Sequence, residues 1–145
     1  MYKTIKLFLR LAIALGFLSA VADRFGMWSK DVSVWGNWEN FVSYTQLINP
    51  WIPISMISAI AIIATGAEIV FALFLLIGFK TELFAKLSGM LLLIFALSMT
   101  FAIGIKAAFD YSVFSAAAAA FALSIMKEKF LEVDGVIATK SQPPI

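Results

Sequence analysis

Residues 54–78 read ISMISAIAIIATGAEIVFALFLLIG, and Glu68 is the one charged residue among them. An α-helix needs about 20 consecutive, mainly apolar residues to cross the hydrocarbon core of a bilayer. Pro53 is placed where a helix starts and Gly78 where one ends. The stretch therefore predicts a transmembrane helix, and its lone carboxylate is the first candidate functional group.

Three further segments have the same apolar character, at residues 4–25, 83–105 and 111–126. The last is slightly short for a span and borrows Asp110 and Lys127 as snorkelling ends. The tight Lys80-Thr81-Glu82 connection requires its flanking helices to run antiparallel. We therefore expect an all-α membrane protein: a four-helix antiparallel transmembrane bundle in one domain, residues 1–130, followed by a disordered cytoplasmic tail, residues 131–145.

The first segment has two interpretations. Lys3, Lys6 and Arg10 precede an apolar run that ends near Ala20-Val21-Ala22, which is typical of a cleaved signal peptide. Arg10, however, interrupts what would be a very short apolar core. This interruption favours an uncleaved first helix.

Composition excludes several kinds of chemistry. Of the 145 residues, 62% are hydrophobic and 14% are charged, and there is no cysteine or histidine. Disulfides, thiol redox chemistry, imidazole-ligated haem and the usual zinc sites are therefore excluded. We expect no metal, no haem and no nucleic-acid partner.

The basic residues predict an orientation. Eight of the eleven lysines and arginines would lie on one side of the predicted bundle, with Arg24, Lys30 and Lys106 on the other. The excess of positive charge marks the cytoplasmic side. We expect both termini in the cytoplasm, most simply at a bacterial inner membrane.

The long connection between the first two predicted helices, residues 23–53, contains all four tryptophans. Trp38, Phe41, Val42 and Thr45 follow helical spacing, which predicts a short interfacial helix. Tryptophan is common at membrane interfaces. The alternative is an aromatic lid over a cavity between the helices.

Small residues recur four apart and predict close helix packing. They are Ala12, Gly16 and Ala20; Ala61 and Thr65; Ala85 and Gly89; and the run from Ala116 to Ala120.

Glu68 would lie near the bilayer midplane, where an ionised carboxylate costs several kcal/mol unless it is paired or protonated. Arg10 is its candidate partner, although snorkelling to the headgroups is an equal alternative for that side chain. Both are candidates for ligand binding or proton handling. The alternative for Glu68 is a purely structural hydrogen bond to Ser98 or Thr100.

A second set of polar and aromatic residues would gather at the outer ends of the helices. Lys106 and Asp110 are four apart and are placed to pair locally. The set forms either an outer vestibule or a solvated rim. Its members are Asp23, Arg24, Trp28, Trp35, Trp38, Lys106, Asp110 and Tyr111.

Several motifs resemble the DoxX family of small four-helix membrane proteins. They are Arg10-Leu-Ala-Ile-Ala-Leu-Gly-Phe-Leu18, Asp23-Arg-Phe-Gly-Met-Trp28, Trp35-Gly-Asn-Trp38, and Ala67-Glu68 through Gly78-Phe-Lys-Thr81. The resemblance covers about residues 7–126. It implies that Arg10 and Glu68 correspond to a recurrent arginine and glutamate of the family.

The resemblance also implies a link to thiosulfate:quinone oxidoreductase and to membrane partners of redox-defence enzymes. Without cysteine or histidine, this chain is at most a subunit of such an enzyme. We expect a noncatalytic or redox-associated subunit that binds a quinone or another apolar molecule, with lipids, a redox enzyme or a second copy as partners. The alternatives are a membrane scaffold or assembly factor without ligand, and a small proton-coupled transporter.

Overall fold

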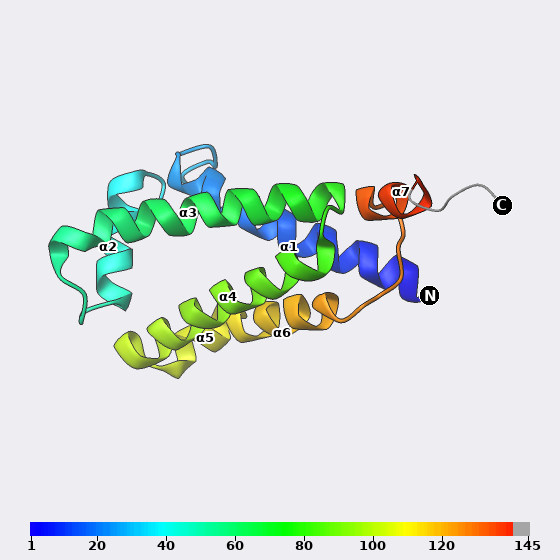
Figure 1. Ribbon diagram of the computed structural model, residues 1–145. Helices are drawn as coiled ribbons and strands as arrows, with labels where there is room; N and C mark the ends of the chain where they lie inside the picture. Colours follow the sequence, from blue (N-terminus) through cyan, green and yellow to red (C-terminus); the bar gives the residue numbers. More distant parts are fainter. Residues whose placement is uncertain (141–145) are drawn as a thin grey trace.

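The computed structural model describes residues 1–140, and within them every regular element is a helix (Figure 1). This confirms the predicted helical class. The elements are α1 Tyr2–Arg24, α2 Trp38–Ile48, α3 Ile54–Ile77, α4 Thr81–Ile103, α5 Ile105–Asp110, α6 Val113–Ser124 and α7 Val133–Lys140.

Among the described residues, α1, α3 and α4 are long and apolar enough to cross a membrane. The fourth predicted span is shorter than expected, because α6 has 12 residues. At about 1.5 Å per residue, it extends roughly 18 Å, less than the thickness of a hydrocarbon core. Ser112 interrupts the chain before α6 with a φ of 55°, in the left-handed region. The structure therefore confirms three candidate spans and leaves the fourth as a short apolar helix.

The long helices associate as two pairs. α1 packs along α3, and α4 packs along α6; the turn at Gly78 joins the pairs, which diverge away from it (Figure 1). In the second pair, a Cβ built at Gly89 would lie 2.8 Å from the ring of Phe121, so only glycine allows this approach. The expected close packing at Gly89 is therefore present. A buried core that includes Phe17, Leu75 and Leu123 fills the region where the pairs meet.

α2 bridges the two pairs at the end where they diverge. Its N-cap is Asn37, whose side chain accepts a hydrogen bond from the Asn40 amide at 2.8 Å. Phe41, near its start, lies under the end of α1, while Ile48, at its end, packs with Met99 of α4. The predicted short helix is therefore present, and its position matches that of a lid.

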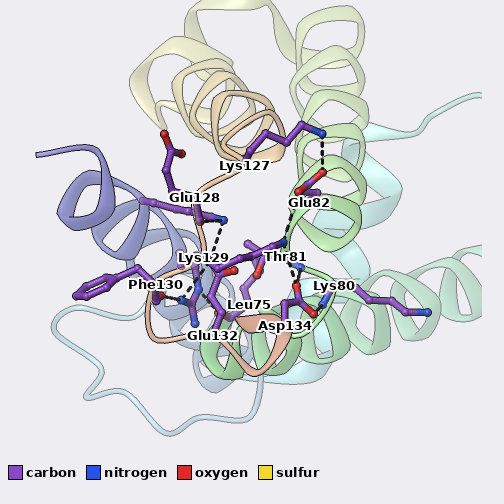
Figure 2. A network of polar contacts seen from close by, with 12 residues as sticks. Leu75, Lys80, Thr81, Glu82, Lys127, Glu128, Lys129, Phe130, Glu132 and Asp134 are labelled. Atoms are coloured by element: carbon purple, nitrogen blue, oxygen red, sulfur yellow. Dashed lines mark hydrogen bonds and ion pairs between the residues drawn. The ribbon is translucent and has the colours of Figure 1, made fainter. Parts of the chain in front are cut away.

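Residues 127–134 form a clasp across the opposite end of the molecule, beside the N-terminus (Figures 1 and 2). The Asp134 carboxylate accepts hydrogen bonds from the amides of Lys80 at 2.8 Å and Thr81 at 3.1 Å. Glu82 pairs with Lys127 at 3.0 Å. The structure thus differs from the expected disordered tail: specific contacts hold residues up to Asp134, and α7 continues to Lys140. Residues 141–145 of that prediction lie outside the described residues.

Candidate functional site

A cavity of about 340 Å³ lies between the two helix pairs, under α2. Apolar residues of α1, α3, α4 and α6 form most of its wall. A small set of polar and aromatic residues interrupts this lining, which is the usual composition of a small-molecule site. The set comprises Arg24, Trp35, Tyr44, Thr45, Asn49, Glu68, Ser98 and Tyr111.

Glu68 of α3 is paired with Arg24, the last residue of α1. The Arg24 Nη2 donates to Glu68 Oε1 at 2.9 Å, and Nη1 lies 2.5 Å from Glu68 Oε2. Nη1 also donates to the hydroxyl of Thr65 at 2.7 Å. Both charged side chains are only 2% exposed. A buried pair of this kind is held by its hydrogen bonds as well as by charge.

The loop after α1 fixes the position of Arg24. Asp23 accepts hydrogen bonds from the Ser33 hydroxyl and from the amides of Val34 and Trp35, at 2.5, 3.0 and 2.8 Å. These bonds fold the loop back over the end of α1. As a result, the Arg24 guanidinium lies 5.3 Å from the ring centre of Trp35.

The same guanidinium lies 3.8 Å from the ring centre of Phe41 in α2. Cation–π contacts of a desolvated arginine are worth about 2 kcal/mol. Arg24 therefore joins α1, α2 and α3 at the cavity wall. Its side chain leans toward the N-terminus of its own helix, into the bundle, as helical side chains do.

Two buried N–H groups of cavity-lining residues have no hydrogen-bond partner among the described residues. They are Nε of Arg24 and Nε1 of Trp35. Buried donors are almost always paired in folded proteins, and an unpaired one costs about 1–3 kcal/mol. Because both residues line the cavity, these groups are the candidate donors to a ligand that carries a hydrogen-bond acceptor.

The expected pairing of Glu68 with Arg10 is wrong. The Arg10 guanidinium instead donates to the carbonyl oxygens of Leu75 and Leu76, each at 2.9 Å, at the end of α3. It also donates to the carbonyls of Phe130 and Leu131 in the clasp, at 3.0 and 2.9 Å. A cation is favourable at a helix C-terminus, where carbonyls lack partners. Arg10 therefore neither snorkels nor reaches the cavity.

Lys6 supports the same end of the molecule. Its ammonium group donates to the Glu128 carbonyl at 2.6 Å and lies 2.9 Å from the Glu132 carboxylate. Figure 2 shows how Glu132 and Asp134 sit among these contacts. Lys6 and Arg10 of α1 thus hold the clasp.

The other interpretation of Glu68, a purely structural hydrogen bond to Ser98 or Thr100, is also wrong. The Ser98 hydroxyl donates to the Asn49 side-chain oxygen at 3.1 Å, and the Thr100 hydroxyl donates to the Ala96 carbonyl at 2.7 Å. Neither is bonded to the carboxylate. The Glu68 carboxylate is instead bonded to Arg24 of α1, which also donates to Thr65 of α3.

The predicted vestibule separates into parts. Arg24, Trp35 and Tyr111 line the cavity, whereas Asp23 organises the loop. Lys106 and Asp110 pair locally as predicted, with both side chains exposed. The remaining two residues of the set, Trp28 and Trp38, do not line the cavity. The Trp28 indole donates to the Ser19 carbonyl at 3.1 Å, and Trp38 stacks on Phe25.

The small residues of α1 have a different role from the one expected. Ala12, Gly16 and Ala20 line the cavity, and a Cβ added at Gly16 would meet no atom within 4 Å. They therefore leave space where the sequence suggested close helix packing. By contrast, Ala61 and Thr65 of α3 are buried as predicted.

The fold and the site define a helical protein with three helices able to cross a membrane and, between its helix pairs, a largely apolar cavity that includes one buried ion pair. Comparisons with family models, curated proteins and solved structures gave no match. Within the described residues, no cluster of acidic side chains is arranged to hold a metal ion. The geometry itself is therefore what supports a function.

Proposed function

We propose that this chain is an integral membrane subunit that binds an apolar small molecule carrying a hydrogen-bond acceptor, with a quinone as the first candidate. One observation carries the proposal: the cavity wall holds a buried Arg24–Glu68 pair, and two N–H groups of its lining residues have no partner among residues 1–140. A quinone head is flat and largely apolar, and its carbonyl oxygens accept hydrogen bonds. It therefore complements both the wall and the donors.

The dimensions support this proposal. A volume of about 340 Å³ falls at the lower end of the range for small-molecule sites, roughly 300–1,000 Å³. Such a site accommodates a ring-sized head with part of an apolar tail. A lipid-soluble ligand would reach it from the membrane in which α1, α3 and α4 are embedded.

The resemblance to the DoxX family belongs to the same proposal. It supports a noncatalytic or redox-associated role, with a redox enzyme or a second copy as partner, in a bacterial inner membrane with both termini in the cytoplasm. Residues 105–126, which contain α5 and α6, would then make the fourth crossing. Within this proposal, Arg24 takes the place of Arg10 beside Glu68 at the ligand.

The test is mass spectrometry of the molecules that remain bound to the full chain after mild detergent extraction. We expect the wild type to retain one defined apolar molecule. The double variant Arg24→Leu/Glu68→Leu should lose it, because it removes the polar wall without leaving an unpaired buried charge.

The matched control is Lys106→Ala/Asp110→Ala, which removes an exposed pair of the same charges. The control should retain the molecule as the wild type does. If all three proteins carry only bulk phospholipid, the proposed binding function is refuted in favour of a membrane scaffold.

A further inference from the structure

The cavity has a polar group at each end of its α2 roof. At the start of α2, Phe41 contacts the Arg24 guanidinium. Just after its end, the Asn49 side chain is bonded to Ser98 of α4. Phe41 and Asn49 are eight residues apart, or about 12 Å at a rise of about 1.5 Å per residue. We call these groups the arginine pole (Arg24, Trp35, Glu68) and the asparagine pole (Asn49, Ser98).

The asparagine pole keeps unused hydrogen-bonding capacity toward the cavity. The Asn49 amide nitrogen donates one hydrogen bond, to the Thr45 carbonyl at 2.9 Å, and carries a second N–H. The Ser98 oxygen is the donor in its bond to Asn49, so its lone pairs remain for another donor. The pole can therefore bind either a carbonyl or a hydroxyl group of a ligand.

Tyr44 lies between the poles on the same helix, and its ring centre is 5.9 Å from that of Trp35. Burial raises the pKa of the Tyr44 phenol, and the nearby Tyr111 raises it further. The hydroxyl is therefore retained as an O–H group. Tyr44, next to Trp35 of the arginine pole, gives the cavity an aromatic surface that extends from that pole, which favours a flat ring over a flexible chain.

We propose that the ligand carries two oxygen groups at opposite ends of a ring-sized apolar core, one bound at the arginine pole and one at the asparagine pole. This inference rests on the proposed function, since it concerns the same cavity. A lipid with a single polar end, such as a fatty acid, would fill one pole and leave the other without a partner. A 1,4-quinone, or the corresponding hydroquinone, matches both.

The experiment is a binding titration on the full chain in nanodiscs, and the quenching of tryptophan fluorescence reports the binding. Two probes are compared: decylubiquinone, which has two opposed carbonyls, and decyl phenyl ketone, which has one carbonyl on a ring. The variants are Ser98→Ala and Asn49→Leu/Ser98→Ala. Ser88→Ala is the control, because Ser88 is a buried α4 serine bonded only to its own helix, at the Phe84 carbonyl, and it does not line the cavity.

We expect the Asn49→Leu/Ser98→Ala variant to raise the Kd for decylubiquinone roughly tenfold, the effect of losing about one good hydrogen bond. Ser98→Ala alone should also raise the Kd for decylubiquinone, by a smaller factor. The Kd for decyl phenyl ketone should stay at the wild-type value, which also shows that the variant is folded.

Two results overturn the inference in distinguishable ways. If decylubiquinone binds the wild type and the asparagine-pole variants equally, the ligand has one polar end and the proposed binding function stands. If neither probe binds the wild type saturably, the proposed function fails together with this inference.

Discussion

Replacement of Glu68 by leucine is expected to lower the free energy of unfolding by about 3–5 kcal/mol. The substitution leaves the Arg24 guanidinium buried, 2% exposed, with only the Thr65 hydroxyl and two aromatic rings around it. An uncompensated buried charge is among the most destabilising changes that a single substitution can make. Thermal unfolding in detergent micelles, followed by circular dichroism, measures the loss as a lower Tm.

The matched control is the double variant Arg24→Leu/Glu68→Leu, which removes both charges. Replacing a whole buried pair by apolar residues of similar size is often close to neutral. We therefore expect the double variant to regain most of the stability that Glu68→Leu loses. A Tm for Glu68→Leu that equals that of the wild type would contradict the pairing described here.

Arg10→Leu is expected to lower the free energy of unfolding by about 3 kcal/mol or more, for a different reason. It removes the donor that serves four carbonyl groups: the buried one of Leu75 and the partly buried ones of Leu76, Phe130 and Leu131. Each carbonyl left without a partner costs about 1–3 kcal/mol, reduced where water reaches it. The loss should be local first, with the clasp opening before the bundle unfolds.

Hydrogen exchange provides the local readout for this variant. The amides of Lys80 and Thr81, which donate to Asp134, should lose protection in Arg10→Leu. Lys3→Leu is the control, since Lys3 is an exposed basic residue of the same helix. Equal protection of these amides in both variants would show that Arg10 does not hold the clasp.

Sequence patterns predicted the first four helices well, whereas the break between α5 and α6, and α7, were not predicted. Apolar length, together with Pro53 and Gly78 at the two ends, placed α3 at residues 54–78, against Ile54–Ile77 in the structure. Helical spacing in the tryptophan loop predicted α2, and the spacing of Lys106 and Asp110 predicted their pair. These features depend on residues close together in the chain, which is why local patterns were sufficient.

The partner of Glu68 could not be predicted in this way. The sequence makes Arg10 the candidate partner and places Arg24 in a vestibule at the outer ends of the helices. The actual pairing depends on how α1 crosses α3 and on the loop that Asp23 folds over the end of α1. A sequence signal did exist: an arginine at the end of an apolar helix leans back into the bundle.

The clasp was missed for a similar reason. The disorder expected for residues 131–145 rests on the end Ser141-Gln142-Pro143-Pro144. The contacts that order the clasp join Lys6 and Arg10 to residues more than 100 positions away. Nothing in the local composition around Glu132 and Asp134 indicates those partners.

The central claim, that the cavity holds a ligand, is tested most directly by filling it. Gly16→Leu places a side chain into the open space beside α1, while Gly66→Leu adds the same atoms at a glycine of α3 that also has open space but does not line the cavity. Both proteins are purified in mild detergent, and the retained small molecules are identified by mass spectrometry. We predict that Gly66→Leu keeps the defined molecule of the wild type and that Gly16→Leu loses it. Retention of that molecule by Gly16→Leu at the wild-type level would contradict the account.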